Sequence, residues 1–474
     1  MFNSQKNKQH IYLVGIKGVG MTMLAQFLAA KGHYLSGSDI EDTFLTDTVL
    51  LDSKIPVFSP FAVKNIPLKI DLIIYSSAFN EQNNPELAVL KNDIKYASVP
   101  KLAYAEALGE VFNHHQGIAV CGSHGKTTVS AWLGYVLWKS GKKPSVLVGS
   151  RVPQFKGSSL SGRSDIFVAE VDEYQNKLQY FQPRGVVLNN IDYDHPDFFK
   201  TEADYVKVFV EFLKKIPRDG FLIMNNHDAH SRRIAKYCRG RVAKYDVDDA
   251  GYSGETVNYL AHNLRLKNGW QSFQVNDWGE FKIKLWGKHN IFNALAVIAS
   301  ARELGVSIAD LKKYLYAFTG TERRAQILGD YKGALIIDDY AHHPTEIKTT
   351  LAGVKEHYPG RRLRVIFHPH TFTRTKALFS DFVESFPLAD ELIILGIYGS
   401  AREKQGGVSS AQLARAIKAF NRRHKISQNV GDLSDLKATT AYLRATVKKG
   451  DIILLLGAGD IFRVGEELLC YQKK

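Results

Sequence analysis

The segment GSHGKTT carries the residues best suited to phosphate chemistry in this sequence. Its members are Gly122, Ser123, His124, Gly125, Lys126, Thr127 and Thr128. A glycine-rich turn offers free backbone N–H groups, a lysine offers a cation, and a hydroxyl can bind Mg²⁺, as the phosphates of a nucleoside triphosphate require. Position 120 is Val, so the spacing departs from the common G-x-x-x-x-G-K-[ST]. We predict that this segment binds ATP.

A second glycine-rich turn, VGIKGVGM, contains Gly15, Gly18 and Gly20 between an apolar run and a helix-like run. Such a turn at a helix N-terminus is an anion site. Asp39 lies about where a ribose-binding acid follows a dinucleotide fingerprint, although the glycine order differs from G-x-G-x-x-G. A dinucleotide site, another nucleotide or diphosphate site, and a purely structural turn all remain open.

Acidic and histidine residues follow two apolar runs after the phosphate segment. Glu170 ends IFVAEV, with Asp172 and Glu173 just beyond it, and His195 follows GVVLNNI. Carboxylates at the carboxyl end of a parallel strand can bind the cation of a nucleotide. His195 taken alone reads as a surface or capping residue. After two successive strands that end in polar groups, we predict a functional role for it.

The segment GKHNIFNALA opens a long apolar run with Asn290 and Asn293 near its start, one turn from His289. Side chains three or four residues apart share a helix face, so these residues can contact one ligand. A plain helix cap is the alternative. Further along, Arg324 follows Arg323 at a predicted domain junction, where an arginine either clamps phosphate on domain closure or is solvated.

The segment DDYAHHPTE gathers polar residues directly after another buried run. Asp339 and His343 belong to it, and Arg374 belongs to the later segment FHPHTFTRT. Such groups at a strand end suit catalysis better than a core. A metal site formed by His342, His343 and His370 is conceivable, but the flanking residues lack the spacing of zinc ligands.

The elements that position these residues follow from an alternation of short apolar runs and helix-like stretches along all 474 residues. This alternation is typical of βαβ units and parallel sheets. It restarts near residue 117 and near residue 333, so we predict an α/β protein of three domains with boundaries at 1–113, 114–325 and 326–474. Residues 250–285 alternate apolar and polar positions, which predicts an antiparallel meander at the edge of the middle domain.

Composition narrows the class of protein. The net charge of +14 suits polyanionic partners, but the basic residues occur in scattered pairs, which favours a solvated surface over a nucleic-acid site. Three widely spaced cysteines argue against a disulfide framework. No apolar stretch approaches the roughly 18 residues of a membrane span. We expect a soluble cytoplasmic protein without nucleic-acid partners or membrane insertion.

Taken together, the motifs resemble the Mur ligase family of peptidoglycan synthesis, in order and spacing over essentially the whole chain. The matching segments are GIKGVGM, YSSAFNEQNNPEL, GSHGKTT, VAEVDE, NNIDYDH, GKHNIFNALA, GTERRAQ, DDYAHHPTEI and FHPHTFTRT. The phosphate segment alone would also allow folylpolyglutamate synthases. The last-domain segments DDYAHHPTE, PHTFTRT and ADELIILGIYGSAREKQGGVSS most resemble the branch of the family that joins L-alanine to UDP-N-acetylmuramate. The chain departs from the pattern of that branch at Thr371, where an arginine is usual.

The resemblance implies a Rossmann-like UDP-sugar domain, a central P-loop ATPase-type domain and a C-terminal Rossmann-like domain. It implies ATP and Mg²⁺ as cofactors, with Mg²⁺ on Thr127, Glu170 and His195. The nucleotide would be held by Asn290, Asn293, Arg324 and Asp339, and the UDP-sugar by Gly15, Gly18, Gly20, Asp39, Ser76 and Ser77. The predicted catalytic residues are Lys126, Glu170, His195, His343 and Arg374. A monomer or homodimer is expected.

Three alternatives remain at this point. DEYQNKL and NNIDYDHPDFF also resemble the family's recycling ligase, which joins a tripeptide to the same UDP-sugar. An NAD-dependent dehydrogenase rests on the first glycine turn and Asp39 alone. A nucleic-acid-dependent ATPase draws on the net charge and predicts a steep salt dependence of nucleic-acid binding.

Overall fold

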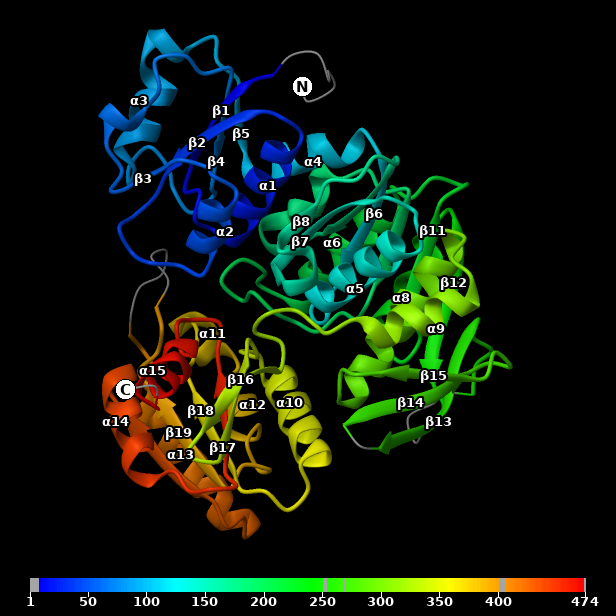
Figure 1. Ribbon diagram of the computed structural model, residues 1–474, viewed down its shortest axis with the longest axis vertical. Coiled ribbons are helices and arrows are strands. Elements are labelled where there is room, and N and C mark those ends of the chain that lie inside the picture. The colour runs from blue at the N-terminus through cyan, green and yellow to red at the C-terminus, as the bar shows by residue number, and fades with distance from the viewer. Residues whose placement is uncertain (1–7, 250–253, 268, 400–405, 473–474) are drawn as a thin grey trace.

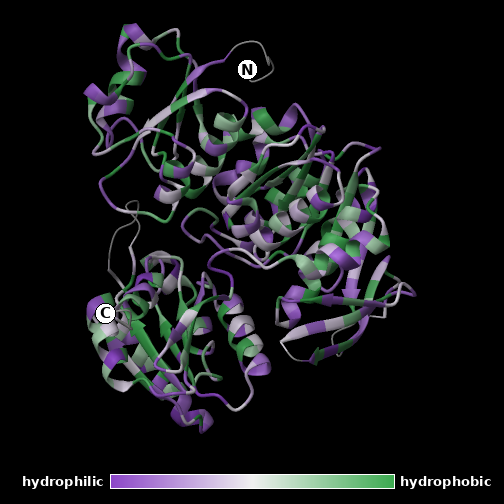
Figure 2. Cartoon of the chain, in the orientation of Figure 1, coloured by the Kyte–Doolittle hydropathy of each residue, from purple (hydrophilic) through white to green (hydrophobic). Residues whose placement is uncertain are grey.

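The computed structural model describes residues 8–249, 254–267, 269–399 and 406–472. Three β-sheets follow one another along the chain, each covered by helices (Figure 1). The predicted α/β fold of three domains is therefore confirmed. Many residues of the strands are hydrophobic, and the helices carry both hydrophilic and hydrophobic residues (Figure 2). No helix within the described ranges is both long and apolar enough to cross a membrane.

The first sheet is parallel, in the order β3-β2-β1-β4-β5. Ile11–Val14 are fully buried, as expected for a strand covered on both faces. The elements are β1 (His10–Val14), α1 (Val19–Ala30), β2 (Tyr34–Ser38), α2 (Thr46–Asp52), β3 (Val57–Phe58), η1 (Val63–Asn65), β4 (Leu72–Tyr75), α3 (Pro85–Asn92), η2 (Ile94–Tyr96), β5 (Lys101–Ala103) and α4 (Tyr104–Asn113).

The middle sheet has ten strands in the order β15-β14-β13-β12-β11-β10-β6-β9-β7-β8. Its elements are β6 (Gln116–Cys121), α5 (Lys126–Lys139), β7 (Ser145–Val152), η3 (Pro153–Phe155), β8 (Gly157–Leu160), β9 (Ile166–Glu170), η4 (Tyr174–Tyr180), β10 (Gly185–Leu188), α6 (Glu202–Leu213), β11 (Phe221–Asn225), α7 (Ala229–Ile234), η5 (Ala235–Tyr237), β12 (Arg241–Val247), β13 (Tyr259–Lys267), β14 (Trp270–Val275), β15 (Glu280–Ile283), α8 (Lys288–Glu303) and α9 (Ile308–Ala317).

The predicted meander is confirmed where the structure describes it. β13 pairs antiparallel with β14, and β14 with β15, at one edge of the middle sheet. Residues 250–253 and 268 of the predicted segment lie outside the described residues. At the opposite edge, β8 pairs antiparallel with β7, a hairpin that the sequence patterns did not indicate.

The last sheet has the order β16-β17-β21-β18-β19-β20, with β16 antiparallel to β17 and the other pairs parallel. Residues 400–405, which the resemblance included, lie outside the described ranges. The elements are β16 (Gln326–Tyr331), β17 (Ala334–Asp339), α10 (Pro344–His357), β18 (Leu363–Phe367), α11 (Phe372–Ala377), α12 (Phe379–Val383), β19 (Glu391–Leu395), α13 (Ser410–His424), β20 (Asn429–Leu433), α14 (Leu436–Thr446), β21 (Ile452–Leu456) and α15 (Phe462–Gln472).

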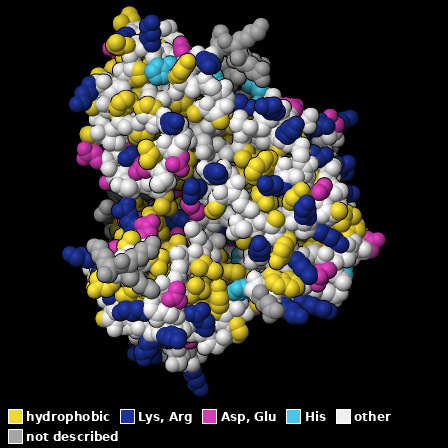
Figure 3. Space-filling view, viewed as in Figure 1, with side chains coloured by type: hydrophobic (Ala, Val, Ile, Leu, Met, Phe, Trp, Pro, Cys, Tyr) yellow, Lys and Arg dark blue, Asp and Glu magenta, His cyan; other side chains and the backbone are white. Residues whose placement is uncertain are grey.

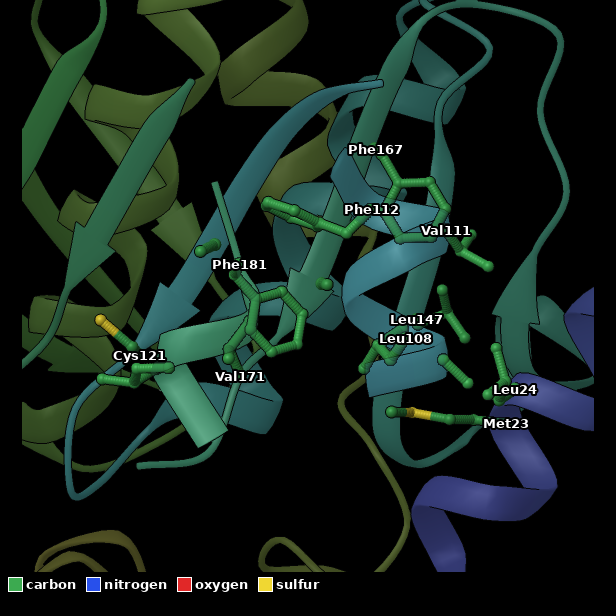
Figure 4. Packing of buried hydrophobic residues seen from close by; sticks show 14 of the residues in the cluster. Met23, Leu24, Leu108, Val111, Phe112, Cys121, Leu147, Phe167, Val171 and Phe181 are labelled. Carbon is green, nitrogen blue, oxygen red and sulfur yellow. The ribbon is translucent and has the colours of Figure 1, made fainter. Parts of the chain in front are cut away.

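The first and middle domains share more of a hydrophobic core than the middle and last domains do. Met23 and Leu24 of α1 pack into one cluster with Leu108 of α4 and Leu147 of β7, so the first and middle domains share a core (Figure 4). The last domain has one cluster on each face of its sheet, and Trp286 of the middle domain joins one of them. Apolar burial therefore fixes the first domain on the middle one, and mainly polar contacts join the last domain to the middle one.

Candidate active site

The phosphate loop lies between β6 and α5, where the sequence predicted it. Gly122 has φ +120° and Gly125 has φ +79°, a backbone region that favours glycine. A Cβ on Gly125 would lie 2.6 Å from Oδ1 of Asn293, and one on Gly122 would lie 2.6 Å from the carbonyl oxygen of Asn190. The loop ends at the N-terminus of the 14-residue helix α5, whose free N–H groups and dipole favour an anion.

Lys126 directs its ammonium group back over this loop. Nζ donates to the carbonyl oxygens of Gly122 (2.5 Å) and Ser123 (3.1 Å) and lies 3.4 Å from Oε2 of Glu173. Burial alone would lower the pKa of Lys126, but the charges of Glu173 and Asp172 outweigh it and raise the pKa above its usual value. Lys126 is therefore a fixed cation at the phosphate loop.

Thr127 and Glu170 form the first candidate cation site. The Thr127 hydroxyl donates to Oε1 of Glu170 (2.8 Å), and the backbone N–H of Gly149 donates to Oε2 (2.7 Å). Glu170 is the last residue of β9, so the carboxyl end of that strand faces the start of α5. A hydroxyl beside a carboxylate at the phosphate loop is a donor set that suits Mg²⁺.

His195 lies in a second group of possible cation ligands. One ligand atom each of Asp172, Glu173 and His195 lies within 4.8 Å of the others. His195 has φ +57° and stacks on the Tyr174 ring at 4.5 Å between ring centroids, which fixes its direction. Among its carboxylate neighbours are Glu173 at 3.8 Å and Asp194 at 3.9 Å. The donor types of this group also suit a divalent cation.

The first glycine turn faces the middle domain across a cavity of about 310 Å³. Gly18, Gly20, Ser76, Ser77 and Glu170 are among its lining residues. Four of these five were predicted to bind the UDP-sugar and the fifth to bind metal. A Cβ on Gly20 would lie 2.6 Å from the Tyr104 ring, so the close approach needs glycine.

Gly15 and Asp39 are not among the residues that line that cavity. Gly15 has φ +83° and donates its N–H to the carbonyl oxygen of Ser38. Asp39 is buried, and its carboxylate accepts from the N–H groups of Lys17 (2.6 Å) and Ile40 (2.8 Å). Burial raises its pKa above the usual value. In this structure Asp39 holds the backbone of the glycine turn.

A larger cavity of about 700 Å³ lies between the middle and last domains. His124, Gly125, Thr128, Asn290, Asn293, Arg324 and Asp339, all predicted to bind ATP, are among its lining residues. The Asn290 side chain donates to the carbonyl oxygen of Trp286 (2.7 Å) and accepts from Asn293 (3.1 Å). The cavity begins at the phosphate loop and has room for a nucleoside.

His124 joins the phosphate loop to the last domain. Its Nε2 lies 2.9 Å from Oδ2 of Asp192, and its Nδ1 lies 3.2 Å from Oε1 of Glu346 on α10. Burial would lower the pKa of His124, but hydrogen bonds and charges from Asp192 and Glu346 raise it to about 9. Thr345 also donates to Asp192 (2.7 Å). These contacts hold α10 against the phosphate loop.

The remaining predicted catalytic residues lie at the same domain boundary. His343 is buried as the N-cap of α10, accepts from the N–H of Thr345 (3.3 Å) and lies 3.6 Å from Asp192. Arg374, at the start of the last domain's α11, pairs with Asp194 of the middle domain at 2.9 Å. Both residues of the last domain thus lie next to an aspartate of the middle domain.

Some residues of the site were not among the predicted ones, or were predicted differently. Asp192 and Tyr205 contact the phosphate loop but were not predicted. Arg323, beside Arg324, pairs with Asp338 (3.0 Å) and donates to the backbone at Gly457, which gives it a structural place. Among the described residues, no metal-ligating group combines His342, His343 and His370.

The phosphate loop, the two cavities and the polar domain boundary agree with what comparison with known proteins finds. The Mur ligase family, catalytic domain, matches residues 10–124, the Mur ligase middle domain residues 120–301, and the Mur ligase, glutamate ligase domain, residues 323–459. Together the three models span nearly the whole chain.

Individual relatives match over the full length. The chain is 39% identical to a UDP-N-acetylmuramate–L-alanine ligase of Desulfitobacterium hafniense, over 97% of this chain and 99% of the relative. The crystal structure of a UDP-N-acetylmuramate-alanine ligase from Thermotoga maritima matches with a TM-score of 0.82 at 25% identity, over 98% of this chain and 99% of that one. A murein peptide ligase from Psychrobacter arcticus shares the fold, with a TM-score of 0.72 at 24% identity and 98% of both chains covered. The chain belongs to the Mur ligase family and is an ATP-dependent ligase that forms amide bonds.

Proposed function

We propose that this enzyme joins L-alanine to the lactyl carboxylate of UDP-N-acetylmuramate, with conversion of ATP to ADP and phosphate. A carboxylate oxygen of the sugar attacks the γ-phosphorus, and ADP leaves. The alanine nitrogen then attacks the acyl carbon of the acyl phosphate, loses a proton, and phosphate leaves. The observation that carries this proposal is the full-length similarity to relatives named as L-alanine ligases of this UDP-sugar.

The three domains divide the substrates. We assign the UDP-sugar to residues 1–113, ATP to residues 114–325, and closure over the nucleotide and amino acid to residues 326–474. The smaller cavity supports this division, because Gly18 and Ser76 of the first domain line it together with Glu170 of the middle domain. A sugar bound there has its reactive end beside the acid that faces the phosphate loop. Proximity of the two reactants is a main source of rate in such a site.

The residues of the middle domain neutralise and position phosphate. Lys126 and the N–H groups at the start of α5 hold the phosphates, and Asn290 and Asn293 hold the base in the larger cavity. Thr127 and Glu170 at the first candidate cation site and His195 at the second are the proposed Mg²⁺ ligands, and their hydroxyl, carboxylate and imidazole groups fit that ion. Mg²⁺, when bound, offsets negative charge on the triphosphate. No covalent link to the enzyme is needed.

Two arginines at the boundary complete the site, Arg324 at the end of the middle domain and Arg374 in the last domain. Arg324 lines the larger cavity and lies 3.6 Å from Glu346, and Arg374 lies at the boundary beside Asp194. Both are cations that can stabilise negative charge as the γ-phosphoryl group is transferred. We further propose that the enzyme acts in the cytoplasm as a monomer or homodimer on small-molecule substrates. Lys and Arg side chains are spread over the face seen in Figure 3 rather than gathered in one patch, which suits such substrates better than nucleic acid.

The test is phosphate release by the purified chain with ATP, Mg²⁺ and UDP-N-acetylmuramate, with L-alanine, glycine, L-serine or the recycled tripeptide as acceptor. We expect turnover that requires the UDP-sugar and is fastest with L-alanine. Turnover with the tripeptide alone assigns the chain to the recycling branch. Equal phosphate release without any acceptor contradicts the ligase assignment.

A further inference from the structure

The hydroxyl of Tyr205 lies behind the phosphate loop, on helix α6. It is 2.8 Å from Oε1 of Glu173 and 2.8 Å from Oγ of Ser123. The Tyr205 side chain is fully buried. One phenolic oxygen therefore connects a side chain of the phosphate loop to the acid group that follows β9.

Glu173 is itself almost completely buried, at 1% exposure. Its Oε1 accepts from Tyr205 and lies 3.8 Å from Nε2 of His195, while its Oε2 lies 3.4 Å from Nζ of Lys126. A buried carboxylate needs partners of this kind, because it has lost its water. The orientation of the Glu173 carboxylate thus decides how close its negative charge lies to Lys126 of the phosphate loop and to His195 of the candidate cation group.

The direction of the hydrogen bonds is set by chemistry. An ionised carboxylate only accepts, so the single hydrogen of Tyr205 goes to Glu173. The single hydroxyl hydrogen of Ser123 is then shared between the phenol oxygen of Tyr205 (2.8 Å) and the carbonyl oxygen of Asp192 (2.7 Å).

We propose that Tyr205 is a positioning residue for the cation and the triphosphate: its hydroxyl holds Glu173 and the Ser123 turn in register, so that Glu173 keeps facing Lys126 and His195 when a nucleotide binds. This rests on the proposed ATP-dependent function. When phosphates draw Lys126 away from the carbonyl oxygens of Gly122 and Ser123, the bond from Tyr205 keeps Glu173 from turning. Groups that orient direct ligands in this way strongly affect metal affinity.

The packing around Tyr205 allows the hydroxyl to be tested alone. Its ring contacts Phe199 and Phe209 edge-on, at 5.1 and 5.3 Å between centroids, and Tyr193 at 6.0 Å. Tyr205→Phe keeps this aromatic contact and removes only the oxygen. Tyr193→Phe is the matched control, because the Tyr193 hydroxyl donates to the backbone carbonyl of Phe199 (2.6 Å) and to no acid of the site.

The experiment measures Mn²⁺ binding by electron paramagnetic resonance in the presence of a non-hydrolysable ATP analogue, without UDP-sugar or amino acid. Tyr205→Phe is expected to weaken Mn²⁺ binding roughly tenfold, and to raise the Mg²⁺ concentration for half-maximal turnover by a similar factor. Tyr193→Phe is expected to leave both unchanged. A loss of thermal stability in Tyr205→Phe with unchanged Mn²⁺ affinity overturns the proposal, because a merely structural role predicts that result.

In Tyr205→Phe, the buried carboxylate of Glu173 loses a hydrogen-bond donor, and this loss alone could prevent folding. A double variant that also removes the charge of Glu173 separates the two effects. Glu173→Gln carries no charge, so adding Tyr205→Phe to it is expected to weaken Mn²⁺ binding no further. A further tenfold loss in the double variant overturns the proposal, because Tyr205 would then act independently of Glu173. If the unaltered protein is active and Tyr205→Phe has the same Mn²⁺ affinity and the same Mg²⁺ requirement, only the positioning role is contradicted. If the unaltered protein binds neither Mn²⁺ nor the nucleotide analogue, the proposed function fails with it.

Discussion

Arg374 and Asp194 form a buried ion pair across the boundary between the last and middle domains, with Nε 2.9 Å from Oδ1 and Nη2 3.3 Å from Oδ2. Burial would raise the pKa of Asp194, but the charge of Arg374 and that of His195 hold it well below its usual value. The pair forms only when the two domains are together. It therefore couples closure of the last domain to the loop that carries His195.

Breaking this pair is expected to slow the reaction through domain closure. Arg374→Met and Asp194→Asn should each lower kcat/KM by about a hundredfold or more, since removing one partner of a buried pair costs about 3–5 kcal/mol. The double variant should lose far less than the product of the two effects. Steady-state kinetics of the four proteins measure this coupling. Effects that simply multiply would show that the residues act independently.

Lys126 is expected to be essential for phosphate transfer. Lys126→Ala removes the fixed cation of the phosphate loop, and loss of one such stabilising group costs about a hundredfold to a thousandfold in kcat. Lys139→Ala is the matched control, because Lys139 ends the same helix α5 and is exposed. Phosphate release and a thermal unfolding curve are measured for both. An active Lys126→Ala enzyme would remove the phosphate loop from the mechanism.

The two possible cation sites predict a dependence on Mg²⁺. Chelation of divalent ions should abolish turnover reversibly, and Glu170→Gln should raise the half-saturating Mg²⁺ concentration by about tenfold or more. Glu211→Gln, which alters a surface carboxylate paired with Lys214 on α6, should leave it unchanged. The half-saturating Mg²⁺ concentration of each protein is measured from turnover across a Mg²⁺ titration. An unchanged requirement in Glu170→Gln would place the cation elsewhere.

His124 predicts a loss of stability on the alkaline side of neutrality. Its pKa rises from 6.5 to about 9 in the folded protein, so its contacts stabilise fully below pH 6.5 and are lost as the pH rises through 9. Asp192 and Glu346, whose pKa values are lowered, stay ionised throughout this range, and His343 beside them has a pKa lowered by burial.

The difference in unfolding temperature between the unaltered protein and His124→Gln should therefore shrink as the pH rises from 6.5 to 9. His114→Gln, a change at an exposed histidine at the end of α4, serves as control. If the difference in unfolding temperature stays constant with pH, His124 is not protonated in its position between Asp192 and Glu346.

Much of the fold could be predicted because its signals are local. A buried run, a glycine turn and a helix start lie next to one another in the chain at both Gly18 and Gly125, so the strand–turn–helix structure could be predicted at both places. The strands that the sequence patterns did not single out include three sheet edges, β8, β16 and β20, and three interior strands, β2, β11 and β12. Edge strands are covered less completely, and NVGDL of β20 accordingly mixes polar and apolar residues without a clear run.

The residues of the site that could not be predicted from the sequence depend on contacts between segments far apart in the chain. Tyr205 lies in an ordinary amphipathic helix, and nothing in its neighbourhood along the chain signals that it meets Ser123 and Glu173. Asp39 shows the converse. Its distance along the chain from the glycine turn suggested a ribose-binding acid. Sequence spacing does not tell whether a side chain points to a ligand or to the backbone, and here the Asp39 carboxylate accepts from the backbone N–H groups of Lys17 and Ile40.

The most direct test of the account follows one oxygen atom. UDP-N-acetylmuramate labelled with ¹⁸O in its lactyl carboxylate is converted with unlabelled ATP and L-alanine, and the released phosphate and nucleotide are analysed by mass spectrometry. Attack of the carboxylate on the γ-phosphorus predicts one ¹⁸O in the phosphate, none in the ADP, and L-alanine in the product. Label in AMP, or phosphate without label, would contradict the proposed acyl phosphate route.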